Sequence, residues 1–551
     1  DMKPLFFPFL ICATIILLLL SVASAKPLPE ETGGGTKCAI CTIAIGLIEQ
    51  MSQIHNQTVD KEIEQLCELF KPPIRQSCEA TVEAYGPIVI KMLENKENGD
   101  KICNTIKFCT IPTCTLYPVK SKVSKHQKWT HYTPQIHAAN AKMDAIDPWG
   151  WLKHIIDVLA NKHEPVEDLD HDYYSRIPTL RGADWRGKDC NDVDNDIYPG
   201  RKASTGASTP GIDNNCNGIF GTDASGKSYE ELFCSGDNTP MGVGVLGDSV
   251  GAHFQIPPKY LTAKDINKTT YDHLLYNVED EFDVPYRSWV TGFRESTADI
   301  PSSSIYKKML ARNLCMHRDY QNLAVNGMAS HAESTVDVES LARNTKTDNP
   351  MLVVFEIVGN DVCKHRLHDM TTPQQFMDYN IASLKYLDTK LPAGSHVLFI
   401  GLAQGEILWD TLHNRTHPVG VPYADVYHFL NCLSISPCTT WLTKNATERH
   451  LTTKRAEELT QTYQTIMDNQ KFQNFDMGFL PFPIVEIMKA YKGPAWQLIE
   501  PVDGFHPSQI ANSLMADLLF DQIDQKYPSF LPKVNPNNAQ IIKIFGQQGG
   551  Y

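Results

Sequence analysis

The chain has 551 residues, of which 42% are hydrophobic and 21% are charged, and its formal net charge is −14. A chain of this length is expected to fold as about two to four units. The negative charge argues against a nucleic-acid partner, whose phosphates would be repelled. Beyond the first 25 residues no apolar run approaches the length that spans a bilayer.

The first 25 residues have the pattern of a secretory signal peptide. Lys3 precedes an apolar run from Leu5 to Leu20, and small residues up to Ala25 follow it. A short propeptide-like segment is expected over 26–36. One of the 15 cysteines, Cys12, lies in the leader, so 14 remain. With four acceptor sequons, this predicts disulfides, glycosylation and a secreted or lysosomal location. The predicted glycosylation sites are Asn56, Asn267, Asn414 and Asn445.

Residues 37–116 form the first expected domain, in which six cysteines from Cys38 to Cys109 alternate with three amphipathic helical patterns. This combination resembles a saposin B-type domain, which implies a lipid-binding helical head with the pairs Cys38–Cys109, Cys41–Cys103 and Cys67–Cys78. By itself, a six-cysteine pattern allows 15 connectivities. The alternative to lipid binding is that this head is a disulfide-linked helical bundle that only packs on its neighbour.

Residues 117–180 have the composition of a linker with a proteolytic processing site. Lysines and aromatic residues between Lys120 and Tyr132 suit an anionic lipid surface or a partly ordered linker, and a short helix is expected over 147–159. The polar stretch 161–176 is of the kind that proteases cut. Cys114 lies outside the six-cysteine frame, so we expect it to pair at long range.

The next segment, 181–240, is acidic and rich in glycine. Carboxylate and amide oxygens at alternating positions on tight loops are the ligands that Ca²⁺ prefers. Ala203 stands where an EF-hand needs glutamate, so the segment resembles the aspartate loops of extracellular proteins instead, with Cys190–Cys216 as a clasp. The alternative is an acidic solvated loop. The candidate ligands are Asp168, Asp170, Asp172, Asp184, Asp189, Asn191, Asp192, Asp194, Asp196, Asp213, Asn215, Asn217 and Asp223.

From residue 241 to 551, apolar runs of strand length alternate with helical segments. The runs are 241–247, 323–325, 351–357 and 396–402. This pattern predicts an α/β domain with a doubly wound, mainly parallel sheet, whose functional sites lie at the carboxyl ends of the strands. Gly247 ends the first strand, and Asp248 and Ser249 follow it at once. Alone, this motif is more often a polar turn than a catalytic one.

Other candidate residues follow later strands. Gly327 can present a bare backbone N–H, and Asn360 offers a side-chain amide. Asp503 and His506 are three residues apart at a helix entrance, where the carboxylate can orient the imidazole. Asp248 is expected to support the turn rather than to react.

Together these four blocks resemble the GDSL, or SGNH, hydrolase family, in the family's order. The resemblance implies Ser249 as nucleophile, His506 as general base and acid, and Asp503 as the residue that fixes the imidazole. It also implies an oxyanion hole formed by the N–H of Ser249, the N–H of Gly327 and the amide of Asn360. The implied reaction is ester hydrolysis through an acyl-enzyme.

A saposin-type head before an SGNH hydrolase resembles the saposin-containing lipases that remove secondary fatty acyl chains from the lipid A of bacterial lipopolysaccharide. This implies a precursor cleaved into two subunits joined by a disulfide, for which Cys114–Cys438 is the candidate and Cys432 the alternative partner. Phospholipids are possible further substrates, at a lipid aggregate or membrane surface. The competing functions are a broad phospholipase or lysophospholipase B and a non-enzymatic lipid-binding or transfer protein.

Overall fold

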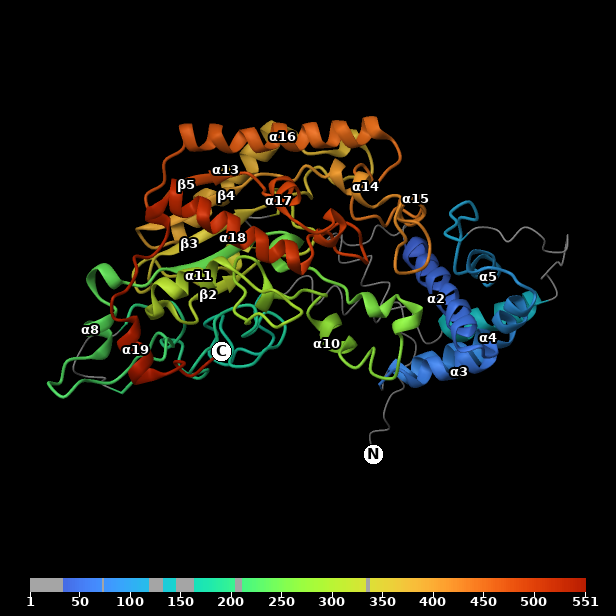
Figure 1. The fold of residues 1–551 in the computed structure, drawn as a ribbon, viewed down its shortest axis with the longest axis horizontal. Coiled ribbons are helices and arrows are strands. Elements are labelled where there is room, and N and C mark those ends of the chain that lie inside the picture. The colour runs from blue at the N-terminus through green and yellow to red at the C-terminus, as the bar shows by residue number, and fades with distance from the viewer. Residues whose placement is uncertain (1–32, 72–73, 118–131, 145–162, 204–210, 333–336) are drawn as a thin grey trace.

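The computed structural model describes residues 33–71, 74–117, 132–144, 163–203, 211–332 and 337–551. The signal peptide, nearly all of the propeptide-like segment, the lysine and aromatic stretch up to His131 and the helix expected over 147–159 lie outside these ranges. None of the helices within these ranges is long and apolar enough to cross a membrane. The molecule has a helical head at one end and an α/β body at the other (Figure 1).

The head is built from the three amphipathic segments that the sequence predicts, and a fourth and a fifth helix complete it. Pro87 lies inside one helix, which continues through it, so it does not break the helix as a proline can. The last helix falls in the segment expected to be linker, yet it packs on the head through a 2.6 Å hydrogen bond from Tyr85 to Asn140. The helices are α2 (Gly33–His55), α3 (Val59–Glu68), α4 (Ile74–Glu94), α5 (Gly99–Thr105) and α6 (Thr133–Asp144).

The body contains a five-stranded sheet of order β2-β1-β3-β4-β5, in which every neighbouring pair is parallel. Its strands are β1 (Gly242–Gly247), β2 (Tyr320–Asn322), β3 (Met351–Glu356), β4 (Ser395–Ile400) and β5 (Phe475–Leu480). The predicted doubly wound fold is confirmed. The strand predicted at 323–325 was placed too late, although Val325 N still donates to Gly247 O at 3.0 Å. The edge strand β5 was not predicted.

Alternate residues of each central strand face opposite layers, as the period of a strand requires. In β3, Leu352 and Val354 join the apolar core under α11 (Ile305–Arg312) and α18 (Gln509–Lys526). Val353 and Phe355 join the core under α13 (Pro373–Lys390) and α16 (Ala446–Asn469). Helices therefore cover both faces of the sheet (Figure 1). This burial explains why the strands appear in the sequence as continuous apolar runs.

The helices of the body are α8 (Tyr229–Phe233), α9 (Ser249–Ala252), α10 (Leu274–Glu279), α11 (Ile305–Arg312), α12 (Asp337–Ser340), α13 (Pro373–Lys390), α14 (Glu406–Leu412), α15 (Tyr423–Cys432), α16 (Ala446–Asn469), α17 (Ile484–Ala490), α18 (Gln509–Lys526) and α19 (Asn538–Phe545).

One apolar core spans the junction between head and body. It contains α2 residues such as Ile48 together with Phe254 and Tyr260 of the body and Phe429 of α15. The head is therefore packed against the body rather than tethered beside it.

Seven disulfides join the described cysteines. The three head pairs and Cys190–Cys216 form as expected. The Cys114–Cys438 pair is wrong, because Cys114 bonds to the alternative partner Cys432 at the end of α15. Cys438 bonds instead to Cys363, which follows β3. The remaining pair, Cys234–Cys315, was not predicted.

Candidate active site

Ser249 lies at the carboxyl end of the central strand β1. Gly247 has to be glycine, because a Cβ there would come within 2.2 Å of the backbone oxygen of Glu356 on β3. Asp248 caps α9, and this helix is only one turn long because His253 takes a left-handed conformation with φ of 64°. The turn thus delivers Ser249 to the edge of the sheet where parallel strands place their functional residues.

Asp248 supports this turn, as expected. Its two carboxylate oxygens each accept a hydrogen bond of 3.0 Å, one from Val250 N and the other from Val358 N. Burial raises the pKa of Asp248 to about 6, although both hydrogen bonds favour the charged form. Asp248 therefore links the serine turn to the end of β3.

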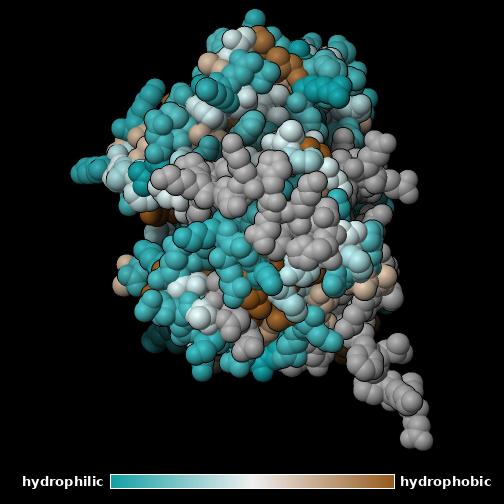
Figure 2. All heavy atoms as spheres, turned by 90° about the vertical axis from the view of Figure 1, so that its right-hand side faces the viewer, coloured by the Kyte–Doolittle hydropathy of each residue, from teal (hydrophilic) through white to brown (hydrophobic). Residues whose placement is uncertain are grey.

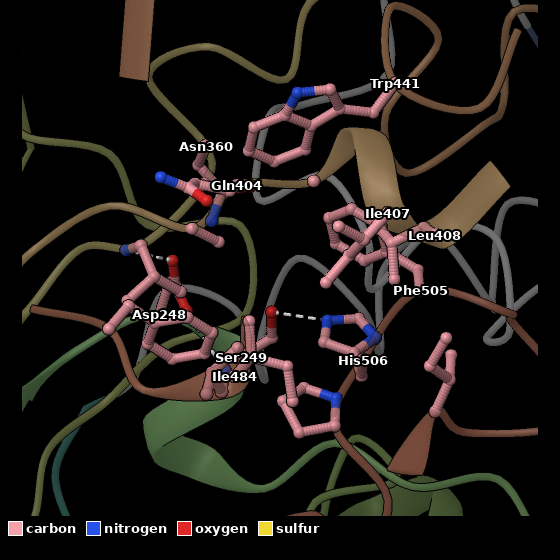
Figure 3. A pocket seen from close by; sticks show the side chains of 18 of the residues that line it. Asp248, Ser249, Asn360, Gln404, Ile407, Leu408, Trp441, Ile484, Phe505 and His506 are labelled. Carbon is pink, nitrogen blue, oxygen red and sulfur yellow. Dashed lines mark hydrogen bonds between the residues drawn. The ribbon is translucent and has the colours of Figure 1, made fainter. Parts of the chain in front are cut away.

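His506 and Asp503 reach Ser249 from the other end of the sequence. Ser249 Oγ lies 2.7 Å from His506 Nε2 (Figure 3), and His506 Nδ1 in turn lies 2.6 Å from Asp503 Oδ2. A carboxylate only accepts hydrogen bonds, so Nδ1 carries the proton and Nε2 is left to accept the serine hydroxyl. Sequence analysis predicted these three side chains, and the structure brings them together.

Neighbouring groups fix the imidazole. The other oxygen of Asp503 accepts hydrogen bonds from the backbone N–H groups of Phe505 and His506. The rings of Phe254 and Phe505 each lie 4.9 Å from the imidazole ring. The imidazole is 3% exposed, so water has little access to it.

Asn360 lines the same pocket as Ser249, whereas Gly327 is not among the residues that line it. Gly327 has a φ of 77°, a conformation that favours glycine. The buried Asp361 joins the two loops, because its oxygens accept Ser330 N at 2.9 Å and Ser330 Oγ at 2.7 Å. Sequence analysis missed this role of Asp361, since only its place after Asn360 was visible.

The pocket next to Ser249 is apolar. The residues that line it follow the carboxyl ends of β1, β3, β4 and β5, and include Ile407, Leu408, Trp441, Phe482 and Ile484. Such a lining can hold a hydrocarbon chain next to the serine.

A second apolar pocket lies in the head between α2, α3 and α4. Isoleucine, leucine and valine side chains line it together with Tyr85 and Phe108. Figure 2 shows this end of the molecule, where hydrophobic residues form small patches on a largely hydrophilic surface.

The acidic loops form a compact carboxylate cluster, defined here as Asp168, Asp170, Asp172, Asp189 and Asp192. Both oxygens of Asp170, and one each of Asp172 and Asp189, are buried and accept no hydrogen bond within the described structure. Burial and neighbouring carboxylates raise the pKa of Asp172 to about 8 and that of Asp189 to about 6. A hard cation would supply the missing positive charge, so the residues fit one.

Other candidate ligands lie outside the carboxylate cluster. Asp184 accepts a hydrogen bond from Tyr276, Asp223 holds its own turn, and Asp196 pairs with Arg201. Asn215 and Asn217 donate to Glu230. Asp194 accepts from Asp196 N, Asp213 accepts from Gly218 N, and Asn191 lies in the turn between Asp189 and Asp192.

A parallel α/β body with this serine site, preceded by a disulfide-linked helical head, defines a lipase of the GDSL type with a saposin-like domain. The profile of the GDSL-like Lipase/Acylhydrolase family matches residues 243–519, and that of the Saposin-like domain matches residues 37–142.

The chain belongs to the acyloxyacyl hydrolase family. It is 39% identical to acyloxyacyl hydrolase of Homo sapiens over 98% of both chains. It is 38% identical to that of Oryctolagus cuniculus, over 99% of this chain and all of that protein. An extracellular lipase from Streptomyces rimosus is 12% identical, with a TM-score of 0.28, over 51% of this chain and 99% of that one. The protein is thus a carboxylic-ester hydrolase.

Proposed function

We propose that Ser249 is the nucleophile of an acyl-enzyme mechanism. Its Oγ attacks the ester carbonyl carbon while His506 Nε2 takes the hydroxyl proton. The tetrahedral intermediate then expels the alcohol oxygen, which receives that proton, and a water molecule releases the fatty acid from the serine by the same route. Asp503 stabilises the imidazolium and keeps Nδ1 protonated.

The oxyanion that forms in this reaction needs donors that are already in place. We assign this role to the N–H of Ser249, the N–H of Gly327 and the side-chain amide of Asn360. The loops that carry Gly327 and Asn360 are joined through Ser330 and Asp361, which supports their acting together. Preorganised donors of this kind are worth about 10²–10³ each in kcat.

The substrate class follows from the family and from the two apolar cavities. We propose that the protein removes secondary, acyloxyacyl-linked fatty acids from the lipid A of bacterial lipopolysaccharide, which detoxifies it, with phospholipids as further substrates. A cavity in the head can hold acyl chains lifted from an aggregate, and the apolar pocket beside Ser249 can hold the chain that is cleaved. The observation that supports the hydrolytic reaction most directly is the hydrogen-bonded chain Ser249–His506–Asp503.

We also propose that the carboxylate cluster binds Ca²⁺. The cluster offers only oxygen ligands, which Ca²⁺ prefers. Several of its carboxylate oxygens have no hydrogen-bond partner among the described residues and could bind the ion. Because the cluster lies in loops away from the serine pocket, its proposed role is to stabilise the fold.

Processing and location complete the proposal. Cleavage between residues 117 and 180 would leave a small and a large subunit that Cys114–Cys432 holds together. The seven disulfides suit the secretory pathway, with the mature protein secreted or in lysosomes. The asparagines of all four sequons are exposed, which glycosylation requires.

The test is to compare the wild type with Ser249→Ala, by mass spectrometry of fatty acids released from purified lipopolysaccharide and from phospholipid vesicles. We expect the wild type to release secondary acyl chains preferentially, and the variant to lose at least about 10⁴-fold in rate while it still binds lipid. Equal activity of the two proteins would exclude the mechanism. Release of primary 3-hydroxy acyl chains would refute the specificity, and preferential phospholipid cleavage would favour a phospholipase B.

A further inference from the structure

The turn that carries Asp503 and His506 is held by side chains from one neighbouring segment, residues 417–427. His417 Nε2 lies 2.6 Å from Val502 O, and Tyr427 Oη donates to Gly504 O at 2.7 Å. Tyr423 Oη donates to Pro501 O at 2.5 Å. All three side chains are buried, and so are most of the turn residues. A buried carbonyl that lost its donor would destabilise the turn, so this segment determines where the turn lies.

The direction of the His417 hydrogen bond is fixed by its other nitrogen. His417 Nδ1 accepts the N–H of Val419 at 3.1 Å, so in the neutral ring Nε2 carries the hydrogen and donates to Val502 O. Burial lowers the pKa of His417 to about 4, which keeps the ring neutral. The imidazole thus links the backbone of residue 419 to the backbone beside Asp503.

The same segment is attached to the saposin-like head. Gln50 of α2 donates its amide Nε2 to Val419 O at 2.9 Å. Gly420, with φ of 87°, lies against this amide, and a Cβ there would be 3.0 Å from Gln50 Oε1. At its other end, α15 is bonded to the head by Cys432–Cys114. Val419 and Val502 also lie in the apolar core that head and body share.

We propose that the saposin-like head positions the catalytic turn, through the hydrogen-bond path Gln50–Val419–His417–Val502, and so acts on turnover as well as on lipid. The proposal rests on the proposed roles of Asp503 and His506. In it, Gln50, His417 and Tyr427 are positioning residues, because they reach the reacting atoms only through the turn. The head would therefore affect the hydrolysis of a small ester that needs no help in leaving a lipid aggregate.

The first test uses Gln50→Met, which keeps the length of the side chain but removes its donor. The matched control is Gln53→Met, an exposed glutamine one turn further along α2. The substrate is p-nitrophenyl butyrate below its aggregation limit. We expect Gln50→Met to lower kcat about fivefold, the order of one hydrogen bond, with KM and the thermal midpoint close to wild type. The control should match the wild type.

The second test uses one variant that contacts the turn outside the path, Tyr427→Phe, and one on the path, His417→Phe. Tyr427→Phe removes the hydroxyl that donates to Gly504 O. We expect it to lower kcat as much as Gln50→Met does, without a change in KM. His417→Phe should lower kcat, and adding Gln50→Met to it should cause little further loss, because both variants interrupt one path.

Three outcomes would overturn the proposal: an unchanged kcat for Gln50→Met on the soluble ester, an equal loss for Gln53→Met, or full additivity with His417→Phe. If only lipopolysaccharide hydrolysis falls in Gln50→Met, the head acts on lipid alone. Failure of the wild type to hydrolyse the ester would contradict the proposed hydrolase mechanism, and that result is distinct from the three above.

Discussion

At the scale of single residues, the site depends on buried carboxyl groups that differ in their partners. Asp248 and Asp361 accept hydrogen bonds on both oxygens and so hold neighbouring loops together. Glu500, three residues before Asp503, is fully buried, and neither of its oxygens accepts a hydrogen bond within the described residues. Burial and the nearby charge of Asp503 raise the pKa of Glu500 well above its usual range. Burial and the nearby Asp503 thus both favour the neutral form of Glu500.

This difference predicts a pH dependence of stability. The folded protein holds the Glu500 proton more tightly than the unfolded chain, so rising pH destabilises the wild type from about 4.5 upward, by at most about 1.4 kcal/mol per pH unit. Glu500→Gln has no proton to lose. The difference in melting temperature, variant minus wild type, should increase between pH 4.5 and 7. If the melting temperatures of the two proteins change with pH by the same amount over that range, Glu500 is not the cause of the pH dependence.

At the scale of elements, the ends of four parallel strands and α14 together form the apolar pocket. Trp441 packs directly on Gly405, where a Cβ would come within 2.2 Å of the indole ring. Ile407 and Leu408 of α14 line the same pocket as Ser249 and His506 (Figure 3). We therefore expect the side chains of α14 to limit the length of the acyl chain that fits next to Ser249.

Replacing Ile407 with tryptophan should shorten this pocket. Losing contact with about two methylene groups costs about 1.6 kcal/mol, or on the order of tenfold in kcat/KM for long acyl chains. Hydrolysis of an acetyl ester should stay within about twofold of wild type. Ile542→Trp, on the exposed face of α19, is the control. An equal loss on short and long esters would mean that Ile407 does not set chain length.

At the scale of the whole molecule, disulfides stabilise the small head, and we expect a bound cation to stabilise the loops of the carboxylate cluster. The head has about 80 residues between its first cysteine and Leu116, and three disulfides close it. The loops around residues 168–192 contribute Leu180 and Trp185 to the core of the body, and they also hold several carboxylates that repel one another. A bound cation would remove this repulsion.

Calcium should therefore raise the melting temperature of the protein. An ion at 100 times its dissociation constant stabilises the folded state by about 2.7 kcal/mol. We expect a chelator to lower the melting temperature, Ca²⁺ to restore it, and Mg²⁺, which prefers a smaller octahedral site, to restore less. Asp172→Asn should abolish the calcium response, and Asp223→Asn, outside the cluster, should keep it. A full response in Asp172→Asn would contradict the assignment.

The local features of this protein could be predicted from its amino-acid sequence alone. Cysteine spacing and amphipathic periodicity indicated the head, continuous apolar runs indicated the central strands β1, β3 and β4, and four short blocks indicated Ser249, Gly327, Asn360, Asp503 and His506. Each of these features depends on residues that are close together in the sequence, because turns, helices and buried strands follow local rules.

Which distant residues meet became visible only in the folded molecule. Cys114 bonds to Cys432 rather than Cys438, because the packing of α15 against the head brings Cys432 near it. Cys438 forms a disulfide with Cys363 beyond the end of β3 instead. The edge strand β5 was missed because it is buried at only some of its positions and lacks a continuous apolar run. The link from Ser330 to Asp361 and the path from Gln50 to Val502 join residues far apart in sequence. Contacts of this kind depend on the packing of whole elements, which no local pattern records.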